Sequence, residues 1–105
     1  MAQVDSLLRV IVALGADELR LGSDRTPQAL LGGAPKKLSA PATPAAELEL
    51  LLAEIVPASA FTELEATGRV EAVHDAQGLG VFGVRITARR HDGPGVFDVS
   101  LRRGA

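Results

Sequence analysis

Two histidines, each followed by an aspartate, are the residues best suited to acid–base or metal chemistry in this sequence. His74 precedes Asp75, and His91 precedes Asp92. A metal centre needs at least three convergent ligands, and neighbouring residues on a strand point to opposite faces of a sheet. Both histidines also lie in or beside predicted turns. The pattern therefore favours two solvated histidines over a metal site.

Other chemistry-bearing residues give no catalytic pattern. Glu63, Glu65 and Glu71 could be read as paired carboxylates, but nothing around them implies a pocket, and a solvated helix face explains them. The serines lie in no nucleophile-elbow context. They are Ser6, Ser23, Ser39, Ser59 and Ser100. We therefore expect no catalytic residue, and we expect that the chain is not an enzyme.

The segment from Gly32 to Ser39, Gly-Gly-Ala-Pro-Lys-Lys-Leu-Ser, superficially resembles a phosphate-binding loop. Such a loop needs Gly-Lys-Ser/Thr in direct succession at the start of a helix, with free backbone N–H groups around the phosphate. The spacing here is different, and Pro35 removes one of those donors. The segment predicts an exposed turn, with no bound nucleotide and no other cofactor.

Composition limits the remaining function classes. The 105 residues suit a single domain, 1–105, with one modest core. Cysteine is absent, which excludes disulfides, thiolate metal sites and thiol catalysis. Three Phe, no Tyr or Trp, and a net charge of -2 argue against nucleic acid as a partner. The N-terminus lacks a basic start, and no apolar run could span a bilayer. We expect a cytoplasmic protein without membrane insertion.

The elements that would position any site are clearest in the last third, Leu79 to Arg103. Apolar residues alternate with mostly polar ones before and after a Gly/Pro/Asp break at 91–95. This pattern predicts two half-buried antiparallel strands joined by a hairpin. One side of this ribbon is apolar and needs a cover. That side comprises Phe82, Val84, Ile86, Ala88, Phe97, Val99 and Leu101.

The first 40 residues predict a helix followed by short strands. Helical spacing begins after Asp5 or Ser6 as N-cap and stops at Gly15. Asp17 to Gly22 predicts a strand, followed by a turn over residues 23–27. A further hairpin would turn at Gly32-Gly33 and return through Lys36 to Leu38, although residues 29–31 are also compatible with a helix.

The middle of the chain predicts two helices. Thr43 would cap the first helix, with Pro44 in its first position, and this helix would run to about Val56. A second helix would start at Pro57 and stop at Gly68. Strands from 69–74 and from the ribbon follow. The predicted fold is α+β: a mostly antiparallel sheet of five to six strands with two to three helices on one face.

Charge is unevenly distributed along the sequence. Residues 43–78 contain seven acids and a single base, Arg69, whereas residues 79–105 contain five arginines and two aspartates. A domain with an acidic helical side and a basic ribbon could associate head to tail or dock on a charged partner. Two ordinary solvated faces would give the same pattern.

Several segments match, in order, those of a known family. They are Gly15-Ala16-Asp17-Glu18-Leu19-Arg20-Leu21, Pro27, Gly33, Lys36-Lys37-Leu38, the helical region 43–68, Gly80-Val81-Phe82-Gly83-Val84 and Leu101-Arg102-Arg103. In this order the chain resembles the N-terminal domain of PilT-like type IV pilus retraction and secretion ATPases. The resemblance covers nearly the whole chain, through order and spacing more than identity.

The sequence departs from this family at positions that carry contacts there. Arg20 replaces a histidine, Leu30 and Gly32 replace an arginine and an aspartate, and Val81 and Gly83 replace two arginines. Those family residues contribute to inter-subunit and nucleotide-side contacts, so these roles do not carry over. Neither a Walker A nor a Walker B sequence is present, so ATP hydrolysis by this chain is not expected.

The resemblance implies a PAS-like module that acts in assembly, because the family's domain packs on the core of the adjacent subunit in a hexameric ring. We expect a non-catalytic protein-interaction role linked to bacterial surface motility or secretion. The expected partner is an ATPase core, a neighbouring subunit in a homo-oligomer or a motility regulator. The expected surface is the exposed edge and outward face of the ribbon, with Arg85, Arg89 and Arg102.

Two alternatives stay open. PAS-like folds can hold small molecules, and related secretion ATPases have N-terminal domains that bind cyclic di-nucleotides; Arg20-Leu21-Gly22 resembles the opening of that motif. The regularly spaced leucines and glycines that should follow are not found. The other alternative is an orphan regulator of motility or polarity, which differs from the assembly module only in its partner.

Overall fold

The computed structural model describes residues 4–38, 41–76, 78–89 and 96–104. Within these ranges the chain forms helices and strands in the order predicted from the sequence. The elements are α1 (Val4–Leu14), β1 (Glu18–Gly22), β2 (Arg25–Leu31), β3 (Ala34–Lys37), α2 (Ala45–Ala53), α3 (Ala58–Thr67), β4 (Arg69–Ala76), β5 (Gly80–Ala88) and β6 (Phe97–Arg103).

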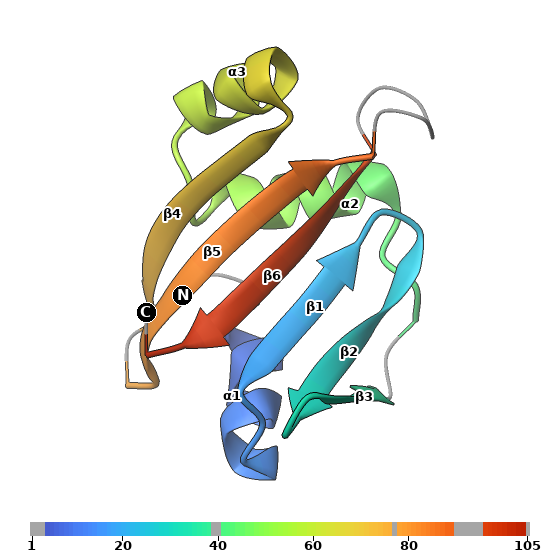
Figure 1. Ribbon diagram of the computed structural model, residues 1–105, viewed down its shortest axis with the longest axis vertical. Coiled ribbons are helices and arrows are strands. Elements are labelled where there is room, and N and C mark those ends of the chain that lie inside the picture. The colour runs from blue at the N-terminus through green and yellow to red at the C-terminus, as the bar shows by residue number, and fades with distance from the viewer. Residues whose placement is uncertain (1–3, 39–40, 77, 90–95, 105) are drawn as a thin grey trace.

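The strands form one open sheet in the order β3-β2-β1-β6-β5-β4, with every neighbouring pair antiparallel. Two local three-strand units meet where β1 pairs with β6, with Leu19 opposite Leu101. The helices lie on one side of this sheet (Figure 1). The predicted α+β class, with a six-stranded antiparallel sheet and three helices, is confirmed in the described part of the chain.

The core lies between the sheet and the helices. The apolar side of the predicted ribbon supplies much of it, and Phe82 and Leu101 are almost fully buried. Leu8 and Ile11 of α1 and Leu48 and Leu52 of α2 cover them. Burying a side chain of this size stabilises the fold by about 1.5–3 kcal/mol, so this layer holds the sheet and helices together.

The β2–β3 hairpin turns at a glycine pair. Gly32 and Gly33 have φ angles of 57° and 87°, which a type I′ turn requires at both central positions and which glycine adopts without strain. The predicted hairpin is therefore confirmed. The segment that resembled a phosphate-binding loop consists of this turn and the exposed strand β3, and Ser39 lies outside the described residues.

The predicted turn over residues 23–27 was too long. Strand β2 already begins at Arg25 and contains Pro27. The register explains how a strand tolerates this proline: Gly22 pairs with Arg25 and Arg20 pairs with Gln28, so Thr26 and Pro27 lie in a β-bulge. A bulge leaves a residue outside the ladder, where the missing N–H of proline costs no hydrogen bond.

Both predicted boundaries of α2 were wrong. The helix runs from Ala45 to Ala53, shorter than expected, and Thr43 is not its cap. Instead, the backbone of Thr43 bonds to the start of β2: its N–H donates to the Arg25 carbonyl (3.1 Å), and its own carbonyl accepts from the Asp24 N–H (2.6 Å). The predicted stop of α3 at Gly68 is confirmed, with φ 82°.

Candidate interaction face

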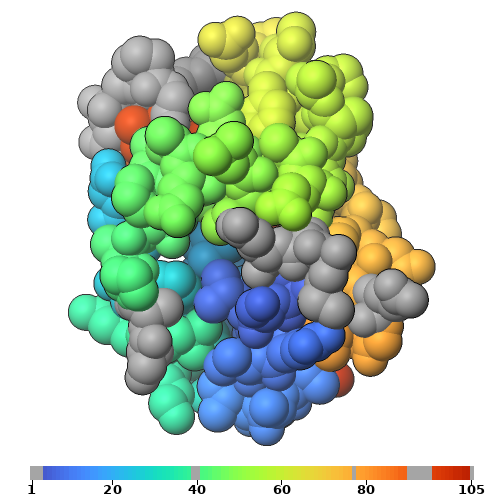
Figure 2. Space-filling view, turned by 180° about the vertical axis from the view of Figure 1, so that it is seen from behind, coloured from blue at the N-terminus to red at the C-terminus, as the bar shows by residue number. Residues whose placement is uncertain are grey.

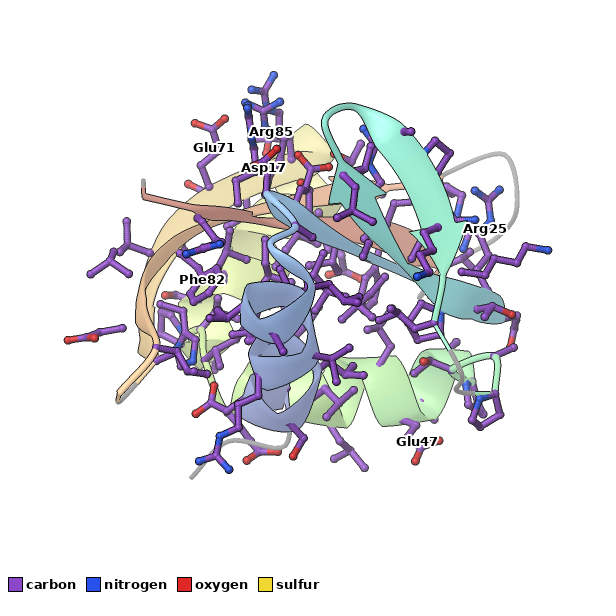
Figure 3. All side chains as sticks on the ribbon, turned by 90° about the horizontal axis from the view of Figure 1, so that it is seen from below. Asp17, Arg25, Glu47, Glu71, Phe82 and Arg85 are labelled. Carbon is purple, nitrogen blue, oxygen red and sulfur yellow. The ribbon has the colours of Figure 1, made fainter. Side chains whose placement is uncertain are left out.

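None of the helices in the described residues lies on the second face of the sheet, and we call this the outer face. Side chains from five strands point to it, because directly opposed residues in antiparallel strands lie on the same side of a sheet. In Figure 3 Arg85 and Glu71 project from this side, while α1 and α2 lie on the other. Its members on these five strands include Glu18, Arg20, Gly22, Arg25, Gln28, Arg69, Glu71, Val73, Asp75, Val81, Gly83, Arg85, Thr87, Asp98, Ser100 and Arg102.

Pairing of β1 with β6 brings basic residues from both ends of the chain together. Arg20 lies opposite Ser100, Ser100 opposite Arg85, and Arg85 opposite Glu71. This row crosses four strands, and one strand separates its two arginines, so their backbones lie about 10 Å apart. Residues far apart in sequence thus become one continuous polar surface.

Three carboxylates on this face each lie between two arginines, and we call these groups the Arg–acid–Arg triplets. Glu18 contacts Arg20 (2.7 Å) and Arg102 (3.3 Å). Glu71 contacts Arg69 (2.7 Å) and Arg85 (3.0 Å). The third triplet joins Asp98 to Arg89 (3.2 Å) and Arg25 (3.9 Å). Each triplet keeps one net positive charge, so the outer face is basic although the whole chain is slightly acidic.

Glu71 shows the effect of this arrangement on a carboxylate. The hydrogen bond and charge of Arg69, and then those of Arg85, hold the pKa of Glu71 below its ordinary value. Glu71 therefore stays ionised, and its triplet keeps the same charge, throughout the neutral range.

The first of two hollows in the outer face is a groove of about 490 Å³ beside the β2–β3 hairpin. In Figure 3 this hairpin rises from the sheet on the side away from the helices. Arg20, Arg25 and Lys37 line the groove together with hydroxyl and amide side chains, and Asp98 is its one acid. The lining is rich in hydrogen-bond donors, which suits a ligand or partner rich in acceptors.

The second hollow, of about 620 Å³, lies over β4, β5 and β6. Gly83 contributes no side chain at its centre, and the exposed Val73 lies opposite it. Arg85 and Arg102 line the same hollow. Arg20, Arg103, Glu18 and Glu71 also line it, so a small apolar floor lies within a rim where arginines outnumber carboxylates.

The three arginines predicted as an interaction surface have different positions. Arg85 and Arg102 lie on the outer face with side chains 57% and 74% exposed. Arg89 is only 13% exposed, and its Nη2 donates to the Ser23 carbonyl at 2.6 Å. Arg89 thus fixes the β1–β2 turn against the sheet. The ribbon also has no free edge, because β1 pairs with β6 and β4 pairs with β5.

Sequence reasoning missed Arg25, Glu18 and Asp98 as members of this face. Alternation along the strands marks Glu18 and Asp98 as outward-facing, whereas Arg25 fell within the predicted turn over residues 23–27. The β1–β6 pairing brings Glu18 to Arg102 and Asp98 to the end of β1. Glu71 had been assigned to a solvated helix face, and it lies in β4 instead. Glu63 and Glu65 are exposed on α3, as expected.

The expectation of a solvated His74 was wrong. Its side chain is 12% exposed, and Nε2 lies 2.8 Å from Oδ1 of Asp5, which is itself buried. Asp5 or Ser6 was expected to cap α1, but both lie within its first turn, and Asp5 joins α1 to β4. The sequence contains a pattern that predicts this burial, because His74 follows Val70 and Ala72 in the inward alternation of β4. His91 lies outside the described residues.

Two features are absent from the described residues. These residues contain no group of three or more His, Asp or Glu side chains placed to hold a metal ion. None of the helices in the same part of the chain is long and apolar enough to cross a membrane.

Comparison with known proteins gives matches only among solved structures. No protein-family model and no curated protein matches the sequence. The pilus retraction motor PilT with bound ADP superposes with a TM-score of 0.81 at 21% identity, over 97% of this chain and 29% of that chain. The ATPase DotB of Legionella pneumophila superposes with a TM-score of 0.84 at 20% identity, over 95% of this chain and 28% of that chain.

These matches concern the fold. The chain spans less than a third of the length of either ATPase. The predicted resemblance to PilT-like pilus and secretion ATPases is confirmed as a likeness of fold over nearly the whole of this chain.

Proposed function

We propose that this chain is a non-catalytic protein-interaction module of a pilus- or secretion-type ATPase system, acting in the cytoplasm through its outer face. The observation that carries the proposal is the open basic sheet face with its three Arg–acid–Arg triplets. The ion pairs of Glu71 with Arg69 and Arg85 are exposed on both sides, and exposed pairs of this kind add little stability. Because their arginine donors are accessible to a partner, association explains these ion pairs better than folding does.

The fold likeness to PilT and DotB supports an ATPase as the partner class. Both chains are more than three times as long as the part matched here, so the natural partner is an ATPase core of the kind that makes up their remainder. A link to bacterial surface motility or secretion follows from the same likeness. An orphan regulator would use the same face on a different partner.

Light scattering of the chain with an ATPase core tests this function. We expect a stable complex with the core and no ATP hydrolysis by the chain alone. A chain that stays separate from several PilT- and DotB-type cores at high concentration would contradict the proposal.

A second candidate is a cyclic di-nucleotide sensor. Arg20, Leu21 and Gly22 all line the 490 Å³ groove, next to Arg25 and Lys37, and cations of this kind bind phosphates. Most small-molecule sites are lined mainly by apolar side chains, whereas this lining is mainly polar, so the assembly role is favoured. An increase in melting temperature with cyclic di-nucleotides would support the sensor, and no shift at high concentration would exclude it.

A further inference from the structure

We infer that the outer face also binds the helical surface of a second copy of this chain, head to tail. The inference rests on the proposed function and deepens it by naming the chemistry of one partner surface: an acidic helix pair with an exposed leucine.

The complementary surface is formed by α2 and α3 on the opposite side of the molecule (Figure 2). Residues 45–67 contain five glutamates and no lysine or arginine. In Figure 3 Glu47 projects from the side opposite to Arg85 and Glu71. These acidic residues are Glu47, Glu49, Glu54, Glu63 and Glu65, all exposed.

An apolar residue lies within this acidic surface. Leu50 is 69% exposed, more than any other large hydrophobic side chain in the described part of the chain. Its neighbours on the outward side of α2 include Glu47, one helical turn earlier. The outer face offers the counterpart, because Val73 and Val81 are 64% and 40% exposed beside the hollow at Gly83. Both surfaces therefore have an apolar centre within charges of opposite sign.

The signs of charge select the mode of association. Two outer faces would bring basic triplets together, and two α2–α3 surfaces would bring glutamates together, so a two-fold contact through either surface is disfavoured. A contact between unlike surfaces pairs opposite charges and repeats from copy to copy, giving a ring or an open chain.

The available area is sufficient. The molecule measures 35 × 23 Å across the sheet, so a whole face offers about 800 Å², the contribution of one partner to a standard interface. The contact depends on charge, so we expect it to weaken as salt rises.

Two charge-reversal variants test the inference. Arg85→Glu/Arg102→Glu damages only the outer face, and Glu47→Lys/Glu49→Lys damages only the acidic surface. We expect wild type to associate with rising concentration at low salt, and each variant to remain monomeric. A 1:1 mixture of the two variants should associate again, because each intact surface meets an intact partner and each reversed surface meets a surface of the opposite charge. Leu50→Ala should weaken wild-type association about tenfold, equivalent to about 1.4 kcal/mol.

Sedimentation velocity distinguishes the outcomes, with circular dichroism confirming that each variant is folded. Wild type that stays monomeric at all concentrations in low salt would overturn the inference, as would a mixture that does not associate. If wild type nevertheless binds an ATPase core, the proposed function stands while the self-association is rejected.

Discussion

The two faces of the sheet come from the same strands but serve different purposes. On β5 the inward Phe82 is 1% exposed, while the neighbouring Val81 is 40% exposed. The inner face holds the helices by apolar burial, and the outer face holds charges in triplets that leave arginine donors accessible. Under the proposed function, alternate residues of one strand thus separate stability from recognition.

The largest effect should come from the inner face. Phe82→Ala removes a buried aromatic side chain and should lower the free energy of unfolding by about 3–5 kcal/mol. Val81→Ala, one residue away on the outer face, should change it by less than about 0.5 kcal/mol. Urea denaturation measures both, and similar losses would show that the faces do not differ as described.

A smaller effect separates two arginines of the ribbon. Arg89→Ala removes the bond to the Ser23 carbonyl and should cost about 1.5–3 kcal/mol. Arg85→Ala removes an exposed side chain and should leave the urea midpoint nearly unchanged. Equal destabilisation by the two substitutions would contradict the assignment of Arg89 to structure and Arg85 to the surface.

Gly22 is a place where the outer face does constrain the fold. A Cβ there would lie 2.6 Å from Oδ1 of Asp98, so Gly22→Ala should cost about 1 kcal/mol as the carboxylate moves. The cost should largely vanish in an Asp98→Ala background, which a double-mutant cycle measures. If Gly22→Ala destabilised the Asp98→Ala variant as much as wild type, Asp98 would not be the source of the strain.

The smallest expected effect is on the titration of Glu71. Arg69→Ala should raise the pKa of Glu71 toward its ordinary value, because Arg69 is the main cause of the lowered pKa; Arg85→Ala should raise it less. Since the folded pKa is lowered, the contribution of this carboxylate to stability is present above the ordinary pKa and is lost as pH falls through the folded pKa. NMR titration of the Glu71 side chain in both variants checks whether Arg69→Ala raises its pKa more than Arg85→Ala does.

Local patterns predicted much of this fold. Alternation identified β5 and β6, and Gly32-Gly33 identified the β2–β3 turn. Non-local pairing was not predictable: the β1–β6 contact joins Glu18 to Arg102 across most of the chain, and it creates the outer face. Arg89 matched the outward alternation, but its burial depends on the distant Ser23.

The most direct test of the central claim compares Arg85→Glu/Arg102→Glu with the matched control Arg9→Glu/Lys36→Glu, which makes the same change in charge outside both hollows. The account predicts that both variants melt within about 3 °C of wild type, since the replaced side chains are exposed. Binding to an ATPase core should fall at least about tenfold for the outer-face variant alone. Unchanged binding by the outer-face variant would contradict the account.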